Sequence, residues 1–199
     1  MRKNKKLILG LLLTLFMLTL VACGTNKTSG KENNKTPATD NASNNTAPMT
    51  KEEYAKYLSE RYDYYFDNDT VEKQYETYNI YNDTFDYSGT YNEFITGFTN
   101  FYGVQRDNLK AFKKDLETNV RKGTPEVDKL NQEIITAIDK AILADDKYHE
   151  GFGTTTKDYG TLAKDEVIKG LRDIGRAPHE ARVELDELID NAKDKLGID

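Results

Sequence analysis

The sequence predicts an all-α fold, an up-down helical bundle of about four helices that follows a disordered tether. Three observations support this. Apolar residues recur at steps of three and four through nearly all of residues 50–199, which is the spacing of a helix face. No window shows the sustained alternation of apolar and polar residues that is typical of a strand. The stretch 24–48 has no large apolar residue, so it has nothing to bury in a core.

The first helix is expected to begin at Thr50, because Thr50 and Glu53 fit a capping box in which each side chain binds the other's backbone amide. A break is expected near residues 67–70, where Asp and Asn cluster. The inward seam of this segment is rich in tyrosine. It comprises Tyr54, Tyr57, Arg61, Tyr64, Asn68, Val71, Tyr75, Tyr78, Asn82 and Phe85.

The second helix is expected to open with a further capping box at Thr90–Glu93 and to stop at Gly123. Gly97 and Gly103 weaken it by about 1 kcal/mol each relative to alanine. The third helix follows Thr124, with Pro125 in its first turn, and is expected to end at residues 151–153, where two glycines flank Phe152.

The last segment carries a helical apolar rhythm from Val167 to Ala192 that passes straight through Pro178. A proline inside a helix removes one hydrogen bond and clashes with the preceding turn. Two interpretations stay open, one helix kinked near Gly175 to Pro178 or two collinear helices. The alternative architecture is a three-helix arrangement in which the tyrosine-rich first segment packs loosely.

The N-terminus has the three parts of a secretory signal. Four basic residues between Arg2 and Lys6 precede an apolar run at 7–20 and small residues before Cys23. The run falls short of the ~20 residues that span a bilayer. The sequence Leu20-Val21-Ala22-Cys23 resembles the lipobox of bacterial lipoproteins, and the long Asn- and Thr-rich spacer after it resembles those of Gram-positive lipoproteins.

That resemblance implies cleavage before Cys23 and lipid attachment to its sulfur. The chain then divides into a signal peptide (1–22), the lipidated cysteine with a disordered tether (23–49) and a helical bundle domain (50–199). The predicted localisation is the cell membrane, where a covalent lipid anchor holds the protein outside the cytoplasm.

Charge and composition argue against several classes of function. Without the signal peptide, 24 basic residues face 34 acidic ones, a net charge of −10, which disfavours nucleic acid as a partner. A single cysteine forms no internal disulfide. There is no Gly-x-Ser-x-Gly elbow and no glycine-rich phosphate loop. We therefore predict a protein that is not an enzyme and uses no cofactor.

Metal ligands were sought among the histidines and acidic clusters. Asp145 and His149 lie four residues apart on one helix face, but two ligands do not complete a zinc site. They are interpreted as a solvated helix end, and His179 as a surface residue at a kink. The stretch Asp67–Asp69 fails as a calcium loop, because the positions after it lack the required oxygen ligand and glycine. No metal site is predicted.

Tyrosine is the most unusual local feature, since eleven of the thirteen tyrosines lie between Tyr54 and Tyr102. Tyrosine offers a large rigid ring with a polar tip and is enriched in binding surfaces. The alternative is that half of these rings form the bundle core, with their hydroxyls toward water. The candidate binding residues are Tyr62, Tyr65, Tyr78, Tyr81 and Tyr87.

The leading hypothesis is a membrane-anchored lipoprotein that binds a protein or cell-wall partner through its tyrosine-rich half, without enzymatic activity. The alternative is a structural or spacer subunit of a cell-envelope complex. That alternative predicts an exposed apolar stripe around Leu185, Leu188 and Ile189.

Overall fold

A computed structural model describes residues 46–197 of the 199-residue chain. The predicted signal peptide, Cys23 and most of the predicted tether lie outside this range. The described residues form six α-helices and one short 3₁₀ turn and contain no strand, which confirms the all-α prediction. The helices are α1 (Lys51–Phe66), α2 (Asp69–Tyr78), α3 (Tyr91–Asn119), α4 (Pro125–Thr155), α5 (Lys164–Ile174) and α6 (Arg176–Leu196), with the 3₁₀ turn at Tyr159–Thr161.

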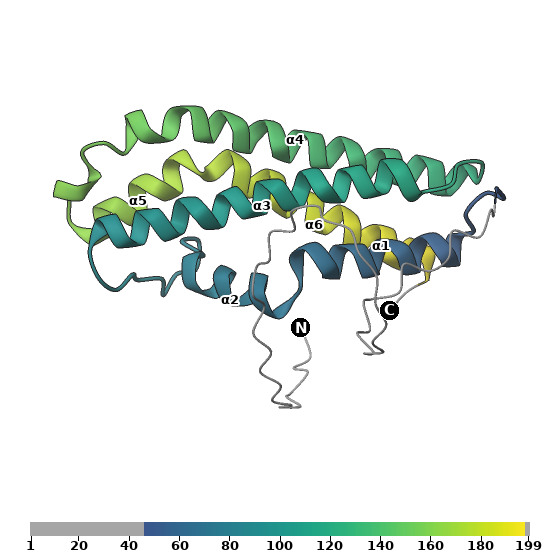
Figure 1. Cartoon of the computed structure of the whole chain (residues 1–199), viewed down its shortest axis with the longest axis horizontal. Helices are drawn as coiled ribbons and strands as arrows, with labels where there is room; N and C mark the ends of the chain where they lie inside the picture. The colour runs from purple at the N-terminus through teal and green to yellow at the C-terminus, as the bar shows by residue number, and fades with distance from the viewer. Residues whose placement is uncertain (1–45, 198–199) are drawn as a thin grey trace, which may run out of the picture. The chain divides into compact units, whose positions relative to one another are not determined.

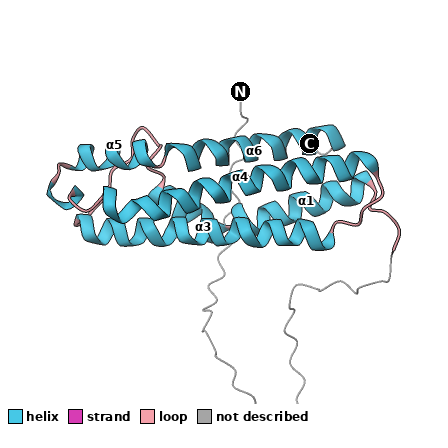
Figure 2. Ribbon diagram, turned by 90° about the horizontal axis from the view of Figure 1, so that it is seen from above, coloured by secondary structure: helices cyan, strands magenta, loops and turns pink. Residues whose placement is uncertain are grey.

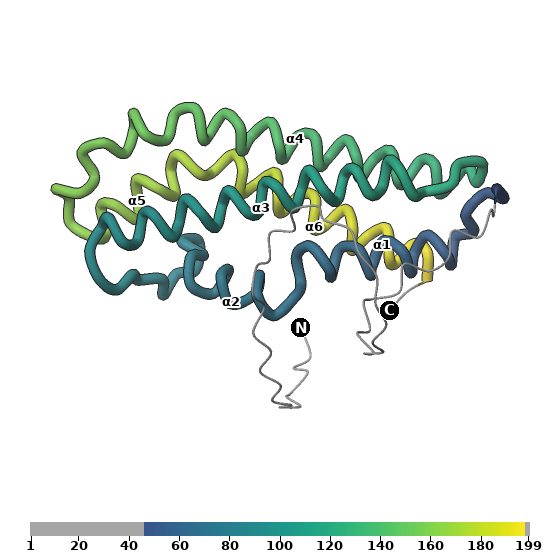
Figure 3. Tube along the Cα trace, viewed as in Figure 1, coloured from purple at the N-terminus to yellow at the C-terminus, as the bar shows by residue number. Residues whose placement is uncertain are grey.

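The six helices make four antiparallel rods, so the up-down bundle is confirmed (Figure 1). The long helices α3 and α4 are single rods. The first rod consists of α1 and α2 with a bend between them, which the trace in Figure 3 follows most clearly. The last rod consists of α5 and α6, which follow one another along one line (Figure 2).

Local capping sets the starts of α1 and α3 as predicted. The Glu53 amide donates to the Thr50 hydroxyl at 3.2 Å, and the Thr50 amide donates to the Glu53 carboxylate at 3.0 Å. Thr90 and Glu93 form the same reciprocal pair. The predicted break between α1 and α2 is also confirmed. There the Asn68 side chain accepts from the amides of Thr70 and Val71, which satisfies the first turn of α2.

The last rod is two helices, which resolves the alternatives left open at Pro178. Gly175 lies between α5 and α6, so Pro178 falls in the first turn of α6, where its missing N–H costs nothing. Gly175 is tightly enclosed, because a Cβ built on it would lie 2.8 Å from the Tyr81 hydroxyl oxygen.

The predicted end of the third helix is wrong by a few residues. Helix α4 continues through Gly151 and Gly153 to Thr155. Each glycine weakens a helix by about 1 kcal/mol. Tyr148 and Phe152 lie on both sides of Gly151 and pack into an apolar cluster, and this tertiary contact outweighs the local preference.

The predicted seam of the first segment is also partly wrong. The buried residues of α1 are Tyr54, Ala55, Leu58 and Phe66, whereas Tyr64 is 63% exposed. With half-buried Tyr62, the three larger ones form a stripe at steps of four. The face that the structure buries thus has residues four apart and contains the most apolar side chains of this helix. The predicted seam, with steps of three and four, leaves out Leu58 and Phe66. Because Tyr54 and Leu58 are fully buried, the loosely packed first segment of the three-helix alternative is not observed.

The interior divides into two apolar clusters along the bundle. The first core joins α1, the C-terminal half of α3, the N-terminal half of α4 and most of α6. The second core joins the 79–90 connection, the N-terminal half of α3, the end of α4 and α5. Leu185 and Ile189 are fully buried in the first core and Leu188 is half-buried, so the apolar stripe predicted to be exposed there is wrong.

The packed region begins slightly before the predicted domain start. Met49, assigned to the tether by the sequence, is 5% exposed and belongs to the first core. Its amide donates to the Arg121 carbonyl at 3.1 Å, and its carbonyl accepts from the Thr124 hydroxyl at 2.7 Å. Within residues 46–197, no helix has the length and apolar character needed to cross a membrane.

Candidate functional site

None of the five tyrosines predicted as binding residues is fully exposed. Tyr62, Tyr65, Tyr78 and Tyr81 are half-buried, and Tyr87 is 7% exposed. The structure does not bring them together, because Tyr62 and Tyr65 pack on the first core and the other three belong to the second. Their part in recognition stays a prediction. The exposed rings of the tyrosine-rich half are Tyr64 and Tyr75.

The two tyrosines at the first core connect helices through their hydroxyls. Tyr62 donates to the Asp186 carboxylate on α6 at 2.8 Å, and Tyr65 donates to the Asp115 carboxylate on α3 at 3.0 Å. Burial and the adjacent carboxylate raise the pKa of Tyr65 to about 12. Both phenols therefore act as hydrogen-bond donors between rods at neutral pH.

Tyr78 and Tyr87 fill space in the second core. The Tyr87 ring stacks on Phe94 with centroids 4.2 Å apart, and Tyr78 stacks on Phe101 at 5.8 Å. The Tyr78 ring also lies against Gly97 of α3, where a built Cβ would be 2.6 Å from Cζ of Tyr78. The glycine that weakens α3 locally is thus required for this close approach.

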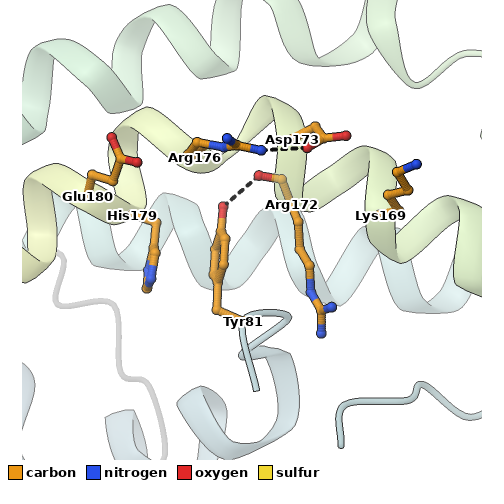
Figure 4. A pocket seen from close by; sticks show the side chains of 7 residues that line it. All are labelled: Tyr81, Lys169, Arg172, Asp173, Arg176, His179 and Glu180. Atoms are coloured by element: carbon orange, nitrogen blue, oxygen red, sulfur yellow. Dashed lines mark hydrogen bonds and ion pairs between the residues drawn. The ribbon is translucent and has the colours of Figure 1, made fainter. Parts of the chain in front are cut away.

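Tyr81 lines a surface hollow of about 430 Å³ beside the α5–α6 joint. Figure 4 shows its ring between the side chains of His179 and Arg172. The Tyr81 and His179 rings are parallel, with centroids 3.7 Å apart. The Tyr81 hydroxyl donates to the Arg172 carbonyl at 3.1 Å. In return, the Arg172 guanidinium donates to the carbonyls of Ile80 and Asn82, the latter at 2.8 Å.

The rim of the hollow is charged. Lys169, Arg172 and Arg176 supply three cations, and Asp173 and Glu180 supply two carboxylates. Arg176 pairs with Asp173 at 2.8 Å, whereas Lys169 makes no ion pair within residues 46–197. Burial lowers the pKa of His179, so its ring is largely neutral at pH 7.

The sequence interpretation missed this hollow. The sequence predicts His179 as a surface residue at a kink, whereas the structure shows its ring half-buried and stacked on Tyr81. The available signal was the spacing of Lys169, Arg172 and Arg176, which places three cations on one helical face of an acidic chain. The sequence could not predict that Tyr81 lines this hollow, because Tyr81 lies in a connection about 90 positions earlier in the chain.

A second hollow of about 500 Å³ lies along the connection between α2 and α3. It is lined by Tyr78, Tyr87 and Phe94 together with the carboxylates of Glu76, Asp86 and Glu93. Its charge is opposite in sign to that of the Tyr81 hollow.

The interpretation of Asp145 and His149 as a solvated helix end is wrong. Asp145 is 4% exposed and lies ten residues before the end of α4, in the bundle interior. Burial raises the pKa of its carboxyl to about 6. His149 is half-buried beside Tyr148, and burial lowers its pKa. Among residues 46–197, no group of three or more His, Cys, Asp or Glu side chains is arranged to hold a metal ion.

Comparisons with known proteins returned no similarity for this chain. No protein-family model, no curated protein and no solved structure matches it.

Proposed function

We propose that the protein is a lipoprotein anchored at the cell membrane through Cys23, outside the cytoplasm, and that its helical domain binds a protein or cell-wall ligand without enzymatic activity. The anchor is supported by the lipobox-like residues Leu20 to Cys23 and the signal-like segment before them. Two or more acyl chains give stable attachment where one is marginal.

The observation that carries the binding role is the hollow beside Tyr81. Its volume of about 430 Å³ lies within the ~300–1,000 Å³ typical of ligand pockets. It combines the flat Tyr81 and His179 rings with a charged rim, which is the mixture of apolar wall and oriented polar groups that ligand sites use. Tyr81 also belongs to the tyrosine-rich half predicted to contact the partner.

The anchor is tested by Cys23→Ser. We expect the chain without the substitution in the membrane fraction. Its intact mass should equal that of a chain beginning at Cys23 plus the attached acyl groups. The variant has no sulfur to acylate, so its intact mass should show no acyl groups. An unsubstituted chain without lipid, or a Cys23→Ser chain that still carries the acyl mass, would contradict the anchor.

The binding role is tested by co-sedimentation of the full chain, held in detergent micelles, with delipidated cell walls that retain their bound proteins and, separately, with walls stripped of them. Lys169→Glu reverses a rim charge that makes no ion pair in the described structure, so it should reduce sedimentation at least fivefold without loss of helix content. Lys114→Glu is the matched control, an exposed lysine on the far half of α3. Tyr64→Ala with Tyr75→Ala tests the exposed rings in the same assay.

Three results are informative. Loss in Lys169→Glu alone supports the Tyr81 hollow as the site. Loss only in the Tyr64 and Tyr75 variant keeps the binding role but moves it to the exposed rings. No sedimentation of the unmodified chain with either material contradicts the binding role.

A further inference from the structure

The two cores are separated by a band of polar side chains, which we call the polar layer: Gln105 and Arg106 of α3, Asp145 and Tyr148 of α4, and Arg182 of α6. Along α3, Gln105 lies between Tyr102, which packs on the second core, and Leu109 of the first. Along α4, Asp145 lies between Ala144 and Tyr148, which belong to opposite cores. The apolar interior is therefore interrupted at one level of the bundle.

The polar layer is poorly satisfied by the residues around it. Buried atoms without a hydrogen-bond partner in the described structure include Gln105 Nε2, Arg106 Nε, the Tyr148 hydroxyl and Arg182 Nη1. Asp145 makes no hydrogen bond or ion pair there either, and the ion pairs of the two arginines in the layer are made with other carboxylates. Arg106 pairs with Asp146 at 3.5 Å and Arg182 with Asp186 at 3.7 Å. Most buried polar groups in native proteins are paired, so such a layer is a weak point of the packing.

Breaks in two of the four rods flank the polar layer. The end of α1 lies beside Asn108 of α3, whose side-chain amide donates to the Tyr65 carbonyl at 2.8 Å. The α5–α6 joint at Gly175 lies beside Tyr148, whose ring would be 3.9 Å from a Cβ built there. Only α3 and α4 run through this level without a break. Local opening is drawn from regions with few apolar contacts across them, and this level fits that description.

We propose that the polar layer is a pH-responsive joint, in which protonated Asp145 holds the two cores together and ionised Asp145 lets the half built on the second core open locally. A buried carboxylate is costly when charged, and the protonated acid both donates and accepts hydrogen bonds. Tyr148, one helical turn along α4, has an unpaired hydroxyl that can accept from the neutral acid.

The charges around Asp145 act in both directions, and burial is the largest influence on its pKa. Arg182, Arg106 and Lys110 favour the carboxylate, whereas Asp146 opposes it. The groups that face it are Tyr102, Arg106 and Lys110 from α3, Asp146, Tyr148 and His149 from α4, and Arg182 with its partner Asp186 from α6. Tyr75 of α2 and Tyr81 of the connection face Tyr102 behind them.

The direction of the effect follows from the raised pKa. In the closed state the pKa of the Asp145 carboxyl is about 6, and in an opened, solvated state it returns to its ordinary value of 3.8. The closed state is therefore favoured most below pH 3.8, where Asp145 is protonated in both states. This stabilisation of the closed state is lost as the pH rises through about 6. Between pH 5 and pH 7 the opening equilibrium should rise roughly tenfold.

Hydrogen exchange of the full chain in detergent micelles tests the proposal, after correction for the intrinsic pH dependence of amide exchange. Peptides from α2, the 79–90 connection and α5 should open roughly tenfold more at pH 7 than at pH 5, relative to peptides from α1 and the end of α6. Asp145→Asn should abolish this difference. Asp139→Asn removes an exposed carboxylate of the same helix together with its ion pair to Lys113 at 2.6 Å, and it should retain the difference.

Two results would overturn the proposal. One is an unmodified chain in which both sets of peptides respond equally to pH, and the other is an Asp145→Asn chain that keeps the difference. Carboxyl NMR of the unmodified chain gives a measure that needs no variant. A titration midpoint of Asp145 near 6 supports the joint, and a midpoint below about 4.5 refutes it.

Discussion

At the scale of single residues, the tyrosine-rich composition is explained mainly by contacts between helices. Tyr62 and Tyr65 each place a ring against the first core and a hydroxyl on a carboxylate of another rod. Tyr54, fully buried, donates to the Asn131 side chain at 3.3 Å. A tyrosine spans the distance between rods and ends in a polar group, so it can contact a half-buried carboxylate or a buried amide that leucine could not hydrogen-bond.

Gly97 gives a prediction at this scale. In Gly97→Ala, the new methyl group meets the Tyr78 ring, which is held between Phe94 and Phe101. We expect the free energy of unfolding to fall by about 1–3 kcal/mol, the usual effect of overpacking, despite the better helix propensity of alanine.

The matched control is Gly103→Ala on the same helix, where no atom lies within 4 Å of the added carbon. Here we expect a gain of about 0.5–1 kcal/mol. Urea unfolding followed by circular dichroism measures both. Equal effects of the two substitutions would show that Tyr78 does not pack against Gly97.

At the scale of elements, local chemistry specified where helices begin but not which face they bury. The boxes at Thr50 and Thr90 depend on groups within three residues, so the sequence predicted them. It also predicted the break at 67–70, where the structure shows the Asn68 cap. The stripe of α1 and the end of α4 depend on the neighbours that cover them, and the predictions there were wrong.

Pro178 gives a prediction about the last rod. Because it lies in the first turn of α6, Pro178→Ala regains no hydrogen bond. We expect the free energy of unfolding to fall by up to about 1 kcal/mol, through a more flexible unfolded chain and the loss of buried ring contacts. A proline inside one continuous kinked helix would behave differently. Its removal would stabilise the protein by about 3 kcal/mol, and thermal and urea unfolding distinguish the two.

At the scale of the whole molecule, the bundle is two cores joined through the polar layer. The first core binds α1 and α6 to the middle of the bundle, and the second binds the 79–90 connection and α5. The hollow beside Tyr81 lies at the α5–α6 joint, where the second core meets this layer. Movement at the layer would therefore reach the candidate binding site first.

Global stability should report the ionisation of Asp145. Above a pH of about 6 the buried Asp145 carboxyl is ionised, and this lowers the free energy of unfolding. We expect Asp145→Asn to raise the free energy of unfolding at pH 7 by about 1–3 kcal/mol. The gain should shrink through pH 5 and vanish below pH 4, where both chains carry a neutral group. Urea unfolding of the full chain at pH 4, 5.5 and 7 measures this, with Asp139→Asn as the control. A gain independent of pH would assign the effect to packing.

The sequence by itself determined the helical class, the four rods and the caps, because periodicity and capping act over a few residues. It also supplied the lipobox-like motif at Cys23, which lies outside the described residues and supports the proposed anchor. Tertiary structure alone decided that the predicted tyrosines face inward, that Asp145 is buried, and that Tyr81 meets His179 and Arg172 across the bundle. These features depend on residues about 40 to 125 positions apart in the chain, and their juxtaposition exists only when the rods pack.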